Sequence, residues 1–155
     1  MRIRILTFTM LAAVLGIAIV TSAQQKPSAA APKIVVYKTS SCGCCKLWAE
    51  YMQKNGFEVE AKDVSSDAVR AVSRAAGLKD DDTSCHTAKV GNYVVEGHVP
   101  AEDIKRMLKE QPAIAGIAAP GMPQGSPGME QGSKEPYDVV SFTKDGKTAV
   151  YAKHR

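Results

Sequence analysis

Three of the four cysteines lie within four residues of one another, in the segment Cys42-Gly43-Cys44-Cys45. Cys42 and Cys45 have the Cys-x-x-Cys spacing, which lets two thiols meet across the first turn of a helix and form a reversible disulfide. The free N–H groups and the positive dipole end of a helix N-terminus favour the thiolate, which is both the nucleophile and the metal ligand. Cys42 and Cys45 are therefore a candidate redox pair, and all three cysteines are candidate metal ligands.

Cys44 is a third thiol, and a redox pair requires only two. On a helix it is rotated by about 100 degrees from Cys45. It shares the i, i+3, i+4, i+7 spacing with Leu47, Trp48 and Tyr51, which is typical of a buried helical face. We therefore expect Cys44 to point towards the body of the fold.

The fourth cysteine, Cys85, is followed directly by His86. Three or four thiolates with imidazole and thioether groups form a donor set for a soft metal, and Cu(I) prefers these ligands. Zinc also accepts sites of three cysteines and a histidine, or of four cysteines, and is the less favoured alternative. Another alternative is a pair of structural disulfides, although a bridge across so short a loop as Cys42–Cys45 removes little chain entropy.

Two histidines and two methionines are further candidate metal ligands, namely His86, His98, Met122 and Met129. The two methionines belong to Pro-Gly-Met repeats in a stretch too rich in glycine and proline to pack as a regular element. By contrast, Met52 and Met107 fall at helical spacing and are expected in the core. His154 lies at the chain end, where we expect it to be solvated.

The first 23 residues have the pattern of a secretory signal. Two arginines precede the apolar run Ile5 to Val20, and Thr21-Ser22-Ala23 offers a cleavage point. An uncleaved anchor is the alternative, but the run is short for a span of about 20 residues. Removal of the signal leaves 132 residues, and the net charge falls from +4 to +2 because two arginines are lost. That charge is too weak to indicate nucleic acid as a partner, and we expect a mature protein that is not embedded in a membrane.

The remaining chain predicts a flexible leader at 24–32 and one α/β domain at 33–155. The expected order is β-α-β-α-β-β-α, at residues 33–38, 43–54, 57–64, 66–76, 86–90, 93–96 and 101–110. A strand followed at once by Cys-x-x-Cys at a helix start is typical of the thioredoxin-like fold, with some other α+β sandwich carrying a metal loop as the alternative. In the thioredoxin-like arrangement, the loop before the third strand brings Cys85 and His86 towards the other three cysteines.

The stretch 112–136 holds five of the eight prolines and five of the twelve glycines. We expect no regular element at that density, only a long Gly/Pro/Met loop. Beyond it, the segments 137–143 and 148–153 flank Asp145-Gly146, which predicts a C-terminal β-hairpin.

Four segments in order resemble the CopG family of periplasmic copper-resistance proteins. They are Ser-Cys-Gly-Cys-Cys, Ser-Cys-His-Thr-Ala, Val-Glu-Gly-His-Val-Pro and Ala-Pro-Gly-Met-Pro-x-Gly-Ser-Pro-Gly-Met-Glu, and the resemblance covers about residues 33–154. The resemblance implies a thioredoxin-like fold, a role in copper tolerance in the periplasm, and a sulfur-bridged multinuclear copper cluster on Cys42, Cys44, Cys45 and Cys85. It also implies thiol or copper redox activity and partners among the copper-export proteins.

Overall fold

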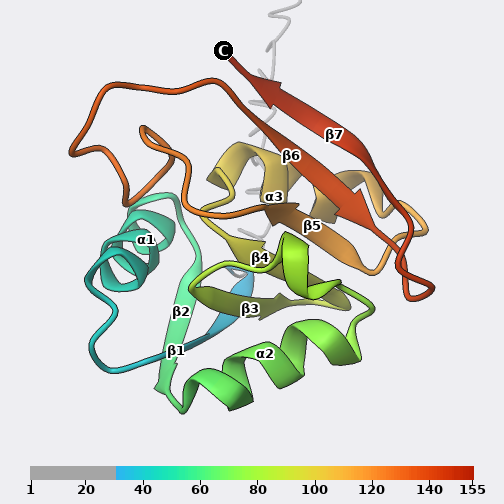
Figure 1. Ribbon diagram of the computed structural model, residues 1–155, viewed down its shortest axis with the longest axis horizontal. Coiled ribbons are helices and arrows are strands. Elements are labelled where there is room, and N and C mark those ends of the chain that lie inside the picture. The colour runs from blue at the N-terminus through green and yellow to red at the C-terminus, as the bar shows by residue number, and fades with distance from the viewer. Residues whose placement is uncertain (1–30) are drawn as a thin grey trace, which may run out of the picture.

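The computed structural model describes residues 31–155 (Figure 1). The predicted signal at 1–23, and all but the last two residues of the predicted leader at 24–32, lie outside this range. Among the described residues, no helix is long and apolar enough to cross a membrane.

The described chain forms three α-helices and seven strands (Figure 1). In order they are β1 (Lys33–Lys38), α1 (Gly43–Lys54), β2 (Glu58–Asp63), α2 (Ser66–Ala75), a 3-10 turn (Asp80–Asp82), β3 (His86–Val90), β4 (Tyr93–Gly97), α3 (Ala101–Glu110), β5 (Gly116–Ala119), β6 (Tyr137–Phe142) and β7 (Thr148–His154). The α/β class and the predicted order β-α-β-α-β-β-α are confirmed, with ends within one residue of those expected. The thioredoxin-like assignment stays a prediction.

One mixed sheet organises the described chain, in the strand order β2-β1-β3-β4-β5-β6-β7. β1 runs parallel to β2 and antiparallel to β3, so the end of β1 and the start of β3 lie at the same edge of the sheet. The Cys42–Cys45 turn follows β1 and Cys85 precedes β3. This pairing is the reason that residues some 40 positions apart in sequence meet.

The core side of α1 differs by one residue from the predicted face. Its buried residues are Cys45, Trp48, Ala49 and Met52, whereas Leu47 is exposed and Cys44 is half-buried. The expectation that Cys44 points into the body of the fold is therefore wrong. Because one residue is about 100 degrees of helix, this small shift buries Cys45 and turns Cys44 towards the surface.

The methionines and apolar strand residues complete the core. Met52 from α1 and Met107 from α3 are fully buried in one cluster, as predicted. The same cluster takes alternate residues of β1 (Ile34 and Val36), which places α1 and α3 on one face of the sheet. α2 covers the opposite face, where the Thr87 hydroxyl oxygen lies 3.4 Å from the carbonyl oxygen of Val69.

The expectation of no regular element in 112–136 is wrong, because β5 lies inside that stretch. The prolines bound this strand and do not interrupt it, since Pro112 precedes it and Pro120 follows it. Gly116 lies so close to β4 that a Cβ there would stand 1.9 Å from the carbonyl oxygen of Val94. The missing side chain of Gly116 thus permits a close pairing of β5 with β4, which the spacing of apolar residues does not predict. Residues 120–136 contain no helix or strand.

The C-terminal hairpin is confirmed. β6 pairs antiparallel with β7, and Gly146 in the connecting turn has a φ of 76°. This left-handed conformation favours glycine.

Candidate metal centre

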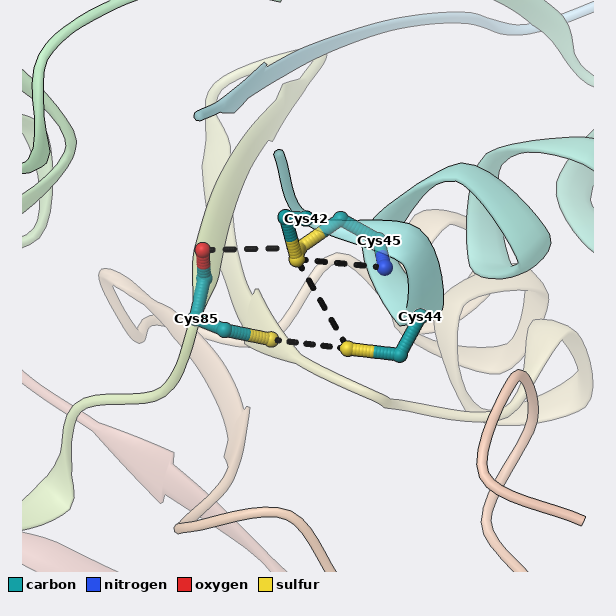
Figure 2. Close-up of side chains that lie close together, drawn as sticks. All are labelled: Cys42, Cys44, Cys45 and Cys85. Carbon is teal, nitrogen blue, oxygen red and sulfur yellow. Dashed lines mark hydrogen bonds between the residues drawn. A yellow bond between two sulfur atoms is a disulfide. The ribbon is translucent and has the colours of Figure 1, made fainter. Parts of the chain in front are cut away.

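The N-terminal end of α1 and the loop before β3 bring all four cysteines together (Figure 2). The Sγ atoms of Cys42 and Cys44 are 3.6 Å apart, and those of Cys44 and Cys85 are 3.7 Å apart. All four sulfur atoms lie within 4.8 Å of one another. The predicted convergence of Cys85 on the other three cysteines is therefore confirmed.

The four cysteines are in two states. Cys42 and Cys45 are joined by a disulfide, with their Cα atoms 5.3 Å apart, while Cys44 and Cys85 remain thiols. Cys42 caps α1, since its sulfur accepts the backbone N–H of Cys45 at 3.3 Å. Cys45 is fully buried, with its Sγ 3.5 Å from the carbonyl oxygen of Cys85. The buried end of the cluster is thus at Cys45, whereas Cys42, Cys44 and Cys85 are half-buried.

His98 faces Cys85 from the end of β4. Its Nε2 lies 3.2 Å from Cys85 Sγ, and its Nδ1 lies 2.8 Å from the carbonyl oxygen of Pro127. A carbonyl only accepts hydrogen bonds, so Nδ1 carries the proton in the neutral ring and the Nε2 lone pair faces the sulfur. Burial lowers the pKa of His98, which favours this neutral form, the one that ligates metals.

His86 is the second buried imidazole of the site. Its Nδ1 lies 3.7 Å from Cys85 Sγ, and its ring packs 4.5 Å from that of Trp48. Its Nε2 has no hydrogen-bond partner among the described residues. Burial holds the pKa of His86 well below its usual value, with His98 lowering it further. With Cys85 and His98 it forms a second group of three potential ligand atoms.

The Cys85 thiol is protonated in the metal-free site. Burial first, and the neighbouring Cys44 second, raise the pKa of Cys85 from 9.0 to about 12. A metal that binds here must therefore displace a proton, so that metal binding and proton release are coupled.

Glu96, on β4, is a site residue that was not predicted from the sequence. It is fully buried, and its two oxygens accept from the Ser84 backbone N–H at 2.7 Å and from the Thr87 hydroxyl at 2.6 Å. One carboxyl group thus holds the residues on both sides of Cys85-His86. The next residue, Gly97, has a φ of 69°, and a Cβ there would stand 2.7 Å from Ser84 Cβ. A charged residue directly after Val94-Val95 in a predicted strand was the available signal.

The loop at 120–136 forms the accessible rim of the site. Met122 is 51% exposed and Met129 is half-buried. Both line a pocket of about 560 Å³ with Cys44 and Leu47. Met122 also lines a second hollow of about 280 Å³ that reaches Cys85. The two methionines thus border the thiols, as their assignment as candidate ligands requires.

Hydrogen bonds at Gly121 and a close approach at Gly128 hold this loop against the cysteines. The Gly121 N–H donates to the carbonyl oxygen of Thr83 at 3.4 Å, and the Ser84 hydroxyl donates to the Gly121 carbonyl. Gly128 lies on the start of α1, where a Cβ would stand 2.8 Å from the Cys44 carbonyl oxygen.

His154 lies apart from this site. It was expected to be solvated, but its side chain is only 20% exposed and its Nε2 lies 2.7 Å from the Asp103 carboxylate. The cause is the hairpin, which brings the chain end against α3 and not into solvent.

Four cysteine sulfurs, two neutral imidazoles and two bordering thioethers define a cysteine-rich metal-binding centre of soft donors on an α/β sheet.

A family model described as "Protein of unknown function, DUF411" matches residues 83–129. A solved structure named "Copper resistance protein copG- Form 2" is 41% identical, with a TM-score of 0.73, and the match covers 81% of this chain and 99% of that one. For "Form 1" of that protein the identity is also 41%, the TM-score is 0.71, and the coverage is 79% and 96%. A comparison with curated proteins finds no match.

The chain therefore belongs to the CopG family of copper resistance proteins. The resemblance seen in the four sequence motifs is confirmed.

Proposed function

We propose that this protein binds Cu(I) as a thiolate-bridged multinuclear cluster on Cys42, Cys44, Cys45 and Cys85, and that it serves copper resistance in this way. The observation that carries the proposal is the convergence of four cysteine sulfurs within 4.8 Å. Membership of a family whose solved structures are named for copper resistance supports copper as the ion.

The spacing of the sulfur atoms supports bridging. A zinc–thiolate bond is about 2.3 Å long, so two sulfurs on one first-row ion lie at most about 4.6 Å apart. The distances of 3.6 Å and 3.7 Å that Cys44 makes with Cys42 and Cys85 fall within that limit. Cys44 is therefore suited to bridge two ions. All four thiolates become available only after the Cys42–Cys45 disulfide has been reduced by two electrons.

Softness of the surrounding donors favours copper over zinc. Thioethers are poor zinc ligands but good Cu(I) ligands, and Met122 and Met129 border the Cys44 pocket. His86 and His98 offer neutral imidazole next to Cys85. We assign these four residues as additional copper ligands or close neighbours of the bound ions.

Titration of the reduced protein against a chromogenic Cu(I) chelator tests the proposal. We expect more than one Cu(I) per chain, because four convergent thiolates exceed the need of one ion. The control is the same protein with its thiols alkylated, which should bind no cluster. Saturation at or below one Cu(I) per chain would contradict the cluster.

A thiol–disulfide oxidoreductase is the second candidate function. The Cys42–Cys45 disulfide at the start of α1, with Cys42 accepting the Cys45 N–H, favours it. Stabilisation of the thiolate by the helix N-terminus eases reduction. We expect a reduction potential above roughly −300 mV, the value below which structural disulfides fall. Equilibration in glutathione buffers with mass-tagged thiols measures it, and a disulfide that resists strong reductant would make these cysteines structural.

We also propose that residues 1–23 direct export to the periplasm, and that the protein exchanges copper there with other copper-handling or copper-export proteins. Support comes from the secretory pattern of these residues. Cell fractionation of the full chain and of a variant lacking residues 2–23 tests the export, and equal recovery in the cytosol would contradict it.

A further inference from the structure

The two free cysteines of the site lie beside Met122. We propose that Cys44, Cys85 and Met122 form a Cu(I) site of their own, which remains available while the Cys42–Cys45 disulfide is closed. This inference rests on the proposed copper-binding function and adds that the oxidised protein still binds one Cu(I).

The two thiols lie close enough together to bind one ion. Their Sγ atoms are 3.7 Å apart, within the limit of about 4.6 Å for two thiolates on one ion. They come from different elements, Cys44 from the first turn of α1 and Cys85 from the loop before β3, and point towards each other (Figure 2). Neither sulfur takes part in the disulfide. Closing Cys42–Cys45 therefore removes two ligands of the proposed cluster and leaves this pair intact.

Access distinguishes these two thiols from Cys45 of the disulfide, whereas Cys42 is half-buried as they are. Cys44 opens onto the pocket of about 560 Å³, and Cys85 opens onto the hollow of about 280 Å³. Cys45, by contrast, is fully buried. An ion arriving from solvent thus reaches Cys44 and Cys85 without any movement of the core.

Met122 is placed to supply the third sulfur. It lines both hollows, and its neighbour Gly121 is hydrogen-bonded to Thr83 and Ser84 directly before Cys85. The side chain is 51% exposed, and methionine is unbranched with three rotatable bonds, so its thioether can turn towards an ion between the thiols. Two thiolates and one thioether form a low-coordinate soft site suited to Cu(I).

Met52 provides a matched control. It is fully buried in the core and lines neither hollow. The same Met→Leu change at the two positions therefore separates the loss of a thioether beside the thiols from a general effect of the substitution.

The binding step involves protons but no electrons. One Cu(I) binds, the Cys44 and Cys85 thiols each release one proton to solvent, and the Cys42–Cys45 disulfide is unchanged.

The experiment is an anaerobic titration of the disulfide form with Cu(I) against a chromogenic chelator. We expect one Cu(I) per chain, with two thiols and one disulfide counted by mass tagging after release of the metal. Cys44→Ser and Cys85→Ser should each abolish this binding. Met122→Leu should weaken it at least about tenfold, the lower end of what loss of even an outer-shell partner costs a metal site. Met52→Leu should leave it unchanged, because Met52 is fully buried in the core.

A parallel titration of the reduced protein separates the two hypotheses. If the reduced form binds several Cu(I) and the disulfide form binds none, this inference is wrong and the proposed function stands. If neither form binds Cu(I), the proposed function itself is wrong. Equal affinity in native protein and Met122→Leu would overturn Met122 as the third ligand. Thermal unfolding of each variant shows whether a loss of binding is a loss of fold.

Discussion

The cysteine site and the C-terminal clasp are two polar clusters built from distant parts of the same chain. The clasp consists of a carboxylate and its neighbours on α3, β6 and β7, namely Asp103, Arg106, Tyr137, Tyr151 and His154. Asp103 accepts from Arg106 at 3.1 Å and from His154 at 2.7 Å, one on each oxygen. The His154 ring stacks on Tyr137 at 4.8 Å, and Arg106 lies 4.2 Å over the Tyr151 ring. Each cluster thus pairs a histidine with an aromatic ring.

Among the described residues, the two clusters differ in which buried atoms have no hydrogen-bond partner. In the clasp these are Arg106 Nε and the Tyr151 hydroxyl. A guanidinium is always charged and has no lone pair to give, and burial raises the pKa of Tyr151, which keeps the phenol protonated. In the cysteine site this atom is His86 Nε2, and two thiols beside it remain outside the disulfide with lone pairs to donate. Spare lone pairs indicate a place for a cation, whereas paired charges indicate a structural contact.

Cys85→Ser should give the largest effect, and it tests the cysteine site. Serine is nearly isosteric but a hard, weakly acidic ligand, so the reduced protein should lose at least one Cu(I) per chain. Its metal-free stability should change little, since no disulfide or large side chain is lost. Cu(I) stoichiometry and thermal unfolding of the reduced protein are the two measurements. Intact copper loading would show that Cys85 is no ligand, despite its distance of 3.7 Å from Cys44.

Glu96→Gln should remove a pH dependence of stability. Burial raises the pKa of Glu96 from its ordinary 4.5 to about 7, so the folded state holds the proton more tightly than the unfolded state. Stability from this group is complete below pH 4.5 and is lost as the pH rises through 7, by about 3 kcal/mol in all. Glutamine has no such titration, and its amide can still accept from Ser84 and donate to Thr87.

Denaturant unfolding of the metal-free protein at pH 5 and pH 8 checks this expectation. The loss of stability between the two pH values should be smaller in Glu96→Gln than in the native protein. The matched control is Asp103→Asn, which changes another buried carboxyl group but should keep the slope due to Glu96. An identical slope in native protein and Glu96→Gln would show that Glu96 titrates alike in the folded and unfolded states.

Asp103→Asn should lower stability and leave copper binding unchanged, which is the reverse of what we expect for Cys85→Ser. The neutral amide cannot balance the charge of Arg106. Its NH₂ group also replaces a carboxylate oxygen that accepted a hydrogen bond, so we expect a loss of about 2 kcal/mol in stability. Copper stoichiometry should not change, because the clasp offers no spare ligand. Unfolding and Cu(I) titration on the same sample measure both. Reduced copper loading in a folded Asp103→Asn protein would contradict the separation of the two clusters.

The sequence was sufficient where side-chain type and spacing determine the structure. Residue spacing identified α1, and the strand order placed Cys85 beside the other cysteines. It was insufficient where tertiary packing decides. The buried face of α1 includes Cys45, not Cys44, because the helix packs on the core with its face shifted by one residue. β5 was missed because Ile117 is the one large apolar residue in this four-residue strand, and Gly116 pairs with β4 by close approach. Glu96 and the Asp103–His154 contact depend on partners 12 and 51 residues away, which no local pattern reports.

The double change Met122→Leu with Met129→Leu should give the smallest effect, and it tests whether the rim belongs to the site. Leucine keeps the volume and loses the thioether, so the fully reduced protein should keep its Cu(I) stoichiometry, since four thiolates remain, and lose about tenfold in affinity, or about 1.4 kcal/mol. Met52→Leu is the matched control: Met52 is fully buried, so its change should cost less than about 1.5 kcal/mol of stability and no affinity. Chelator competition and denaturant unfolding of the native protein, the double variant and Met52→Leu measure affinity and stability. Affinity unchanged in the double variant would place both rim methionines outside the copper site and confine it to the cysteines and histidines.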